Sequence, residues 1–172
     1  MKWKIEVCYK PDMPDAVGQG ISDDIMDLGI TGVSSVRTAQ LYWIEGEFQT
    51  QEVERVCSEL LADPVTQDYV YSISENSVGA IHSQTNTWVV EVRFKPGVTD
   101  AVGDSVIKGI RDLGISGVQA AQTGKKYWLH GHLISSALEI IAQRLLANEV
   151  IQTFEIEQEE GADVVVSSFR EA

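Results

Sequence analysis

The chain of 172 residues is 44% hydrophobic and 23% charged, a composition that can bury a core and that argues against disorder. Its formal net charge of -13 would repel phosphate backbones and anionic lipid heads, and no cluster of Lys and Arg offsets it, so we expect no nucleic-acid or membrane partner. No apolar run approaches the roughly 18 residues that cross a bilayer, the first residues form no apolar signal segment, and we expect a cytoplasmic protein.

The first predicted element is a β-strand. Residues 3–9 alternate apolar and polar side chains, which is the period of a half-buried strand. The same alternation returns at residues 88–94, 85 positions later, and this offset aligns the later motifs without a gap. Two copies of one unit are therefore predicted, and not a solenoid, which usually needs three or more repeats.

A helix is predicted next in each copy, beginning at Asp15 or Asp100, whose carboxylate can accept hydrogen bonds from free amides of the first turn. Its apolar stripe has helical spacing. The stripe consists of Val17, Ile21, Ile25 and Leu28 in the first copy and of Val102, Val106, Ile110 and Leu113 in the second. The stretch DLGITGV, residues 27–33, ends the first helix, and DLGISGV, residues 112–118, ends the second. Because glycine tolerates the left-handed conformation common after a helix, each stretch predicts a helix end and then a glycine turn into the next strand.

A pair of strands is predicted in residues 33–48 and again in residues 118–133. Residues 41–44 are apolar on both faces of such a strand, which indicates a strand covered on both sides. Helices can cover only one side. We therefore expect the sheet of the other repeat to cover the second side, with Trp43 and Trp128 in or near the contact between the repeats.

A second helix and a final strand close each unit, in the order β-α-β-β-α-β. The predicted fold class is α+β: two tandem ferredoxin-like units, with antiparallel sheets and helices on one face, packed as an internal pseudo-dimer. The predicted division is repeat 1 at residues 1–74, a polar linker at 75–86, repeat 2 at 87–160 and a C-terminal tail at 161–172.

The sequence contains no clear catalytic or cofactor motif. The stretch Gly18-Gln19-Gly20 lacks the Gly-Lys-Ser/Thr of a phosphate loop. Cys8 and Cys57 have neither CxxC spacing nor an evident histidine partner, so we expect reduced thiols and no disulfide, zinc site or nucleophile. We predict no catalytic residue, no cofactor and no metal.

Two features leave alternatives open. His130 and His132 would lie on one face of a strand, which suits a metal if His82 supplied a third ligand, but the favoured interpretation is that they are exposed strand-edge residues. Asp27 and Asp112 stand in the last turn of a helix, where the helix dipole disfavours an anion. A backbone amide or a basic residue of a partner would compensate for that cost.

Several motifs together resemble the PurS family, the small subunit of phosphoribosylformylglycinamidine (FGAM) synthase. These are K-P-x-x-x-D-x-x-G, the D-L-G helix end, the stretches VRTAQ and AQTGK, and L-L-A-[DN]-x-V-x-Q. The most characteristic piece is LLANEVIQTFEIEQEE at residues 145–160. The resemblance covers almost the whole chain, twice.

The resemblance implies a role in the fourth step of purine biosynthesis. In that family a separate glutaminase releases ammonia and a separate ATP-dependent synthetase consumes it, while PurS dimerises, bridges the two, assists ammonia transfer and has no activity alone. We expect the same partners here, and we leave open a further self-association of the chain. Fusion of two copies would convert a symmetric dimer into one chain and raise the effective concentration of the halves.

The chain departs from the family where its usual V-R-x-G-K stretch is split between the repeats. Val36-Arg37 remains in the first copy and Gly124-Lys125 in the second, and Ala16 and Ala101 replace the usual proline. We hypothesise that Arg37 and Lys125 mark two docking surfaces, one for each large subunit. The alternative is that the motif is split by simple sequence drift on a solvated turn. The candidate partner-binding residues are Arg37, Gly124, Lys125, Trp43 and Trp128.

Two other functions remain as alternatives. Paired ferredoxin-like units, as in ACT domains, often bind an amino acid at their mutual interface, which would make the chain a small-molecule-sensing regulatory module. Such a site favours a glycine turn after the first strand, and the chain offers Gly97 in one copy but Asp12 in the other. An enzyme that uses His130 and His132 is the third reading.

Overall fold

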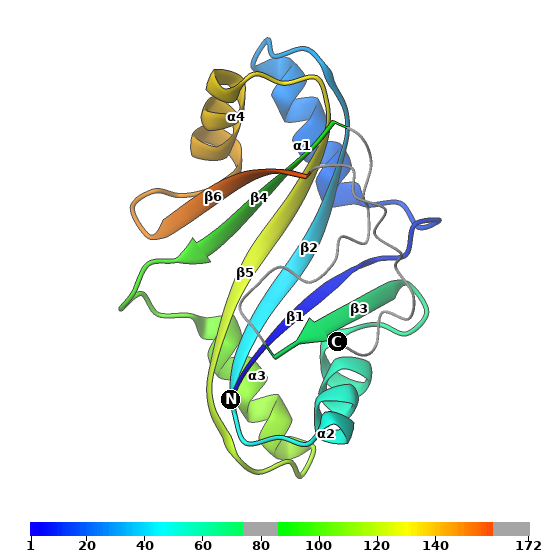
Figure 1. Ribbon diagram of the computed structural model, residues 1–172, viewed down its shortest axis with the longest axis vertical. Helices are drawn as coiled ribbons and strands as arrows, with labels where there is room; N and C mark the ends of the chain where they lie inside the picture. Colours follow the sequence, from blue (N-terminus) through cyan, green and yellow to red (C-terminus); the bar gives the residue numbers. More distant parts are fainter. Residues whose placement is uncertain (74–85, 160–172) are drawn as a thin grey trace.

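The computed structural model describes residues 1–73 and 86–159 and shows one six-stranded antiparallel sheet of order β3-β1-β2-β5-β4-β6 (Figure 1). The first repeat contains β1 (Lys2–Tyr9), α1 (Ala16–Asp27), β2 (Val33–Gly46), α2 (Thr50–Arg55), the π-helical segment η1 (Val56–Leu61) and β3 (Gln67–Ser72). The second contains β4 (Thr87–Phe94), α3 (Ala101–Asp112), β5 (Val118–Gly131), α4 (Ser135–Ile141), the π-helical segment η2 (Ala142–Leu146) and β6 (Gln152–Glu159). Within these ranges no helix combines the length and apolar content that crossing a membrane requires.

The predicted fold class is confirmed: two repeats of the same element order form an α+β pseudo-dimer with an antiparallel sheet and helices on one face. One detail differs, because a single strand of 14 residues, β2 or β5, stands in place of each expected strand pair. The residues between Val33 and Gly46 include no Gly, Asn or Pro that would favour a turn. The ladder between β2 and β5 holds this stretch extended along its whole length.

The two halves join edge to edge, so the expected face-to-face contact of two sheets is wrong. β2 pairs with β5 antiparallel, with Gln40 opposite Lys125. These two residues are equivalent in the repeats, 85 positions apart, so an approximate twofold axis passes between them (Figure 1). The apolar residues on both faces of β2 reflect its central place in a sheet of six strands. As predicted, Trp43 and Trp128 are buried where the repeats meet.

Each hydrophobic core takes side chains from both repeats. Ile25 of α1 is fully buried in the core that β4, β5, α4 and η2 of the second repeat form together with Val36 of β2. Ile110 of α3 is likewise buried in the core formed by β1, β3, α2 and η1 of the first repeat. Burying one such side chain contributes about 1.5–3 kcal/mol. The first helix of each repeat therefore stabilises the opposite half of the molecule.

Local rules explain the repeated motifs of the first helix. The Asp15 carboxylate accepts hydrogen bonds from the backbone amide of Gly18 (2.9 Å) and from the amide and hydroxyl of Thr38 (2.7 and 2.8 Å). Asp100 makes the equivalent bonds to Gly103 and Thr123, so the predicted caps are confirmed. A Cβ atom on Gly18 would clash with the carbonyl oxygen of Val36, which explains the glycine three residues after the aspartate.

The DLG stretches end the helices as predicted and also contact the other repeat. Gly29 and Gly114 have φ values of +82° and +81°, in the left-handed region. In the turn that follows, the amide of Glu47 donates to the carbonyl of Gly117 (3.3 Å) and the amide of His132 donates to that of Gly32 (3.0 Å). The motif occurs in both repeats because each copy connects a helix end to the end of the other repeat's long strand.

Candidate functional site at the centre of the sheet

The histidines do not form the paired arrangement considered from the sequence. His130 is buried in β5, with Nδ1 2.9 Å from the hydroxyl of Thr87, and its burial lowers the pKa of the imidazole, as does, to a smaller extent, the charge of Arg37. His132 is exposed beyond the end of β5, and His82 lies outside the described residues. Among residues 1–73 and 86–159, no three side chains that could bind a metal come together.

Both thiols are buried, and burial raises the pKa of each. Burial is the main cause that raises the pKa of Cys8 to about 12, with nearby acidic groups adding to it. The pKa of Cys57 is raised even further, again chiefly by burial. Because the thiolate is the nucleophilic form, neither cysteine is placed for covalent chemistry.

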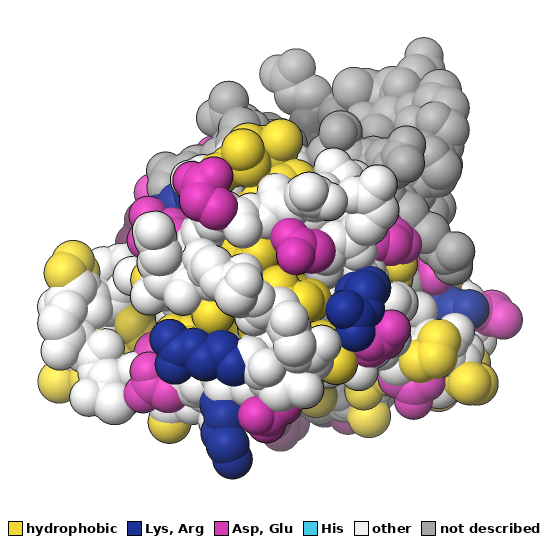
Figure 2. Space-filling view, turned by 90° about the horizontal axis from the view of Figure 1, so that it is seen from below, with side chains coloured by type: hydrophobic (Ala, Val, Ile, Leu, Met, Phe, Trp, Pro, Cys, Tyr) yellow, Lys and Arg dark blue, Asp and Glu magenta, His cyan; other side chains and the backbone are white. Residues whose placement is uncertain are grey.

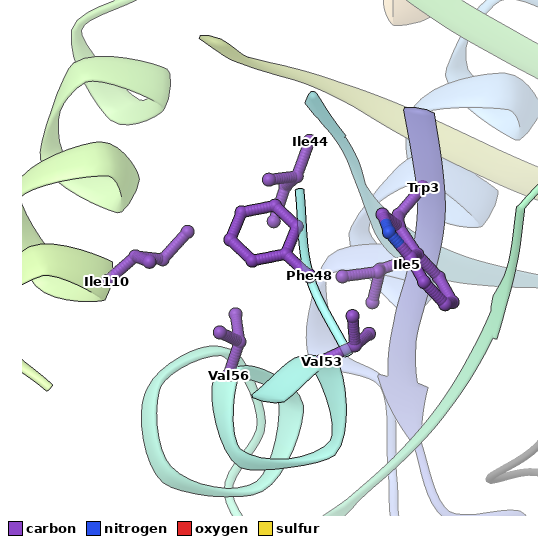
Figure 3. A pocket seen from close by; sticks show the side chains of 7 residues that line it. All are labelled: Trp3, Ile5, Ile44, Phe48, Val53, Val56 and Ile110. Atoms are coloured by element: carbon purple, nitrogen blue, oxygen red, sulfur yellow. The ribbon is translucent and has the colours of Figure 1, made fainter. Parts of the chain in front are cut away.

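A small cavity of about 10 Å³ lies inside the first core (Figure 3). Its lining is Trp3, Ile5, Ile44, Phe48, Val53, Val56 and Ile110. Figure 3 shows Ile110 of α3 facing Phe48 and Val56 across the gap. A space of this size holds at most about one water molecule, and its lining carries no ionisable group. It is a packing gap between the two repeats and offers no site for a reaction.

The sheet face opposite the helices carries a charge network of the buried Lys4, Glu6 and Lys126 with the partly buried Glu91. Lys126 Nζ lies 2.9 Å from Glu6 Oε1, and Lys4 Nζ lies 2.6 Å from Glu91 Oε1 and 3.9 Å from Glu6 Oε1. Glu6 and Glu91 are equivalent in the repeats, whereas Lys4 and Lys126 are not. Each repeat thus supplies one cation and one anion. The two cations stand on non-equivalent strands, Lys4 on β1 and Lys126 on β5. This balance of charges links the two repeats.

Both tryptophans proposed as partner-binding residues, and Gly124, are buried in the same face. Trp43 covers Gly124, where a Cβ atom would lie 2.8 Å from the indole ring, and the Arg93 guanidinium stacks 3.9 Å from the ring centroid. Trp128 packs in the equivalent place, against Ala39. These three residues shape the junction of the repeats from inside.

Arg37 is half-buried and holds the loop between β1 and α1. Its guanidinium donates to the carbonyl oxygens of Met13 (2.9 Å), Lys10 (3.1 Å) and Tyr9 (3.4 Å). Three carbonyl acceptors satisfy a large part of its donor set. The split basic motif lies in the middle of β2 and β5, so the solvated turn considered for it is wrong.

Lys125 differs from the other four candidates because it is exposed. It stands at the twofold axis on the helix-bearing face, beside a cavity of about 190 Å³. The cavity is lined by Val7, Cys8, Tyr9, Val17, Thr38, Ala39, Gln40, Gln67, Lys125 and Tyr127. Residues of α1, β1, β2 and β3 meet two residues of β5 there, so the cavity lies between the repeats.

Two valines of the predicted apolar stripes are not in the core. Val17 and Val102 are each 54% exposed, although helical spacing placed them with buried Ile25 and Ile110. Both stand one turn or less from the start of their helix, near the axis. We call Val17, Gln40, Val102 and Lys125 the axial surface. Sequence reasoning missed the valines, and the repetition of an exposed apolar residue in both copies is the signal that could have found them.

Charges elsewhere are mixed. At the end of the molecule seen in Figure 2, Lys and Arg side chains alternate with Asp and Glu side chains over apolar and uncharged residues. On that face the coloured residues form no continuous basic patch. The exposed Lys125 at the axis is therefore a local positive charge on the described surface of this chain, whose net charge is -13.

A match to one protein family agrees with this duplicated architecture. The family model of PurS, described as phosphoribosylformylglycinamidine (FGAM) synthase, matches residues 2–75 and again residues 87–160. The chain is similar to the solved PurS of Methanocaldococcus jannaschii, one of the subunits of formylglycinamide ribonucleotide amidotransferase in the purine biosynthetic pathway. The identity is 23%, the match covers 43% of this chain and 95% of that chain, and the TM-score is 0.31. No curated protein matches the chain.

Proposed function

Because the chain belongs to the PurS family of FGAM synthase, as both of its repeats match that family, we propose that it is the non-catalytic subunit that bridges a glutaminase and an ATP-dependent synthetase in this complex and assists the transfer of ammonia between them. The double family match carries the proposal. It assigns the chain to a subunit of purine biosynthesis, and the geometry supports a structural role for that subunit.

The disposition of reactive groups supports a subunit that works through contacts. Cys8 and Cys57 are buried as protonated thiols, and His130 is buried against Thr87. The remaining prominent charges of the interior compensate one another in the network around Glu6. These groups stabilise the described part of the fold, and their burial keeps them, including the pair of His130 and Thr87, away from a substrate.

Duplication in one chain supports a bridging role as well. The continuous sheet and the exchanged helices make the two repeats one folded unit, equivalent to a dimer whose halves cannot dissociate. Because the halves differ in sequence, the two ends of the molecule can bind different partners. A symmetric homodimer would present the same surface twice.

Lys125 is the best-placed of the candidate partner-binding residues, since its ammonium group is exposed at the axis. Arg37 would act indirectly, by holding the loop that carries Lys10 and Met13. Gly124, Trp43 and Trp128 would also act indirectly, because they are buried where the two repeats meet.

The test is reconstitution from purified subunits of the same organism. We expect the chain alone to form no product, and we expect glutamine-dependent FGAM synthesis by the glutaminase and synthetase to require the chain. Synthesis from added ammonium salts should need the synthetase alone. Glutamine-dependent synthesis at the same rate without the chain would contradict the proposal.

The cavity between the repeats supports one alternative, a regulatory module that binds an amino acid. Its lining includes the Lys125 amine and the amides of Gln40 and Gln67, which could bind a carboxylate and an amino group. Thermal-shift measurements with the common amino acids and with nucleotides separate the two functions. A scaffold subunit shows no rise in melting temperature, whereas a saturable rise with one amino acid would favour the sensor.

A further inference from the structure

We propose that the axial surface is the docking site for one segment of a large subunit, and that this segment carries an acidic side chain between two apolar side chains. The inference rests on the proposed function and specifies the surface and the chemistry of the contact. It follows from three observations: the helices leave the axis uncovered, the charge exposed there is positive, and apolar groups flank that charge.

The helices begin beside the axis and run away from it. Asp15 binds Thr38, two residues before Gln40, and Asp100 binds Thr123, two residues before Lys125. Each helix then ends where its glycine turn meets the far end of the other repeat's long strand. The middle of the helix-bearing face therefore lies between two helix starts, and the cavity of about 190 Å³ is found there.

The exposed charge at the axis is the Lys125 ammonium. In the described part of the chain Lys125 forms no ion pair, whereas Lys4 and Lys126 are both paired. The nearest capping carboxylates, Asp15 and Asp100, already accept hydrogen bonds from amides and hydroxyls. A carboxylate of the partner complements this lysine, and such exposed charge pairs mainly steer association and fix register.

Apolar contacts are available on both sides of the lysine. Val17 borders the cavity, whose walls include the buried side chains of Val7 and Tyr127. Val102 occupies the equivalent position across the axis and is exposed to the same extent, 54%. An apolar side chain seated in a desolvated pocket is the usual source of affinity at an interface. Only one lysine stands on the axis, because the equivalent residue is Gln40, so one chain offers one such site.

Binding of the full-length chain to the purified synthetase, and separately to the purified glutaminase, tests the inference. The variants are Lys125→Glu and Val17→Glu, and the matched control is Val65→Glu, since Val65 is 76% exposed in the turn before β3. We expect each axial variant to weaken binding of at least one subunit by about tenfold or more, and Val65→Glu to change it by less than about twofold. For the wild type, binding to that subunit should weaken as salt rises, and Lys125→Gln should reduce this salt dependence.

The outcomes distinguish the two levels of the proposal. Circular dichroism and gel filtration first establish that each variant folds as the wild type does, which the exposure of all three residues favours. If the wild type binds neither large subunit, both the proposed function and the docking inference are overturned. If the wild type binds and both axial variants bind within about twofold of it, the docking inference alone is overturned, and the partner contact lies elsewhere.

Discussion

Gln40 and Lys125 lie directly opposite each other in the ladder between β2 and β5, although they occupy the same position in the two repeats. In a symmetric dimer the same residue would face itself at this point. Two lysines there would repel each other, since like charges directly opposite on neighbouring strands are destabilising. A covalent duplication removes this conflict, because one copy can carry glutamine while the other keeps the lysine.

A lysine at both positions should therefore destabilise the fold. We expect Gln40→Lys to lower the free energy of unfolding by up to about 1 kcal/mol in low salt, and by less in 1 M salt, because the repulsion is screened. Urea denaturation at the two salt concentrations measures this. The control is Gln40→Glu, which places an opposite charge beside Lys125 and should not destabilise. An equal loss for both variants would show that repulsion is not the cause.

The exchange of helices between the halves predicts which buried residues are energetically coupled. Ile25→Ala should cost about 2–5 kcal/mol, whereas Ala at neighbouring Met26, which is exposed, should cost little. In double-mutant cycles Ile25→Ala should couple with Val90→Ala, since both side chains lie in the second core, and should add independently to Val53→Ala in the first. Coupling to Val53 instead of Val90 would mean that each repeat closes its own core.

The features that the sequence predicts well depend on near neighbours along the chain. Asp15 as a cap and Gly29 as a helix end follow from the needs of a helix terminus, whatever packs around it. The alternation in β1 likewise depends only on two faces of unequal polarity. These local requirements hold in both repeats, so the same residues recur 85 positions apart and support the same prediction in each copy.

The features that sequence reasoning missed are set by pairing between the repeats. An apolar pattern on both faces of β2 is produced equally by a face-to-face contact of two sheets and by a central position in one sheet, so Trp43 could not decide between them. Val17 carries the right spacing for a core residue, but its helix starts at the axis, where nothing in the described residues covers it. The sequence shows that Arg37 is charged. It does not show that the guanidinium donates hydrogen bonds to three backbone carbonyl groups.

The buried charge network should be far more sensitive than an exposed lysine. Lys126→Leu, which introduces the residue found at the equivalent Leu41, would leave Glu6 without its nearest cation, at 2.9 Å. We expect a loss of about 3 kcal/mol, because the buried Glu6 carboxylate would keep only the more distant Lys4, at 3.9 Å, and a poorly compensated buried charge is costly. The control Lys108→Leu, at an exposed position, should change stability by less than about 0.5 kcal/mol.

Adding Glu6→Gln to Lys126→Leu tests the cause of that loss. The double variant should recover part of it, since the buried negative charge is then removed with its partner. Denaturant unfolding of the four proteins in the cycle provides the measurement. If Lys126→Leu alone were neutral, the network would contribute nothing to the junction of the repeats.

His130 should make stability depend on pH in a predictable direction. Burial lowers the pKa of this imidazole in the folded chain, so the unfolded chain, with a pKa near 6.5, binds a proton more readily. The stabilisation is complete above that value and is lost as the pH falls below it. We expect His130→Gln to show a shallower loss of unfolding free energy between about pH 7 and 5 than the wild type, and His132→Gln, at an exposed position, to follow the wild type. Identical slopes for the wild type and His130→Gln would mean that the buried imidazole is protonated in the folded state as easily as in the unfolded one.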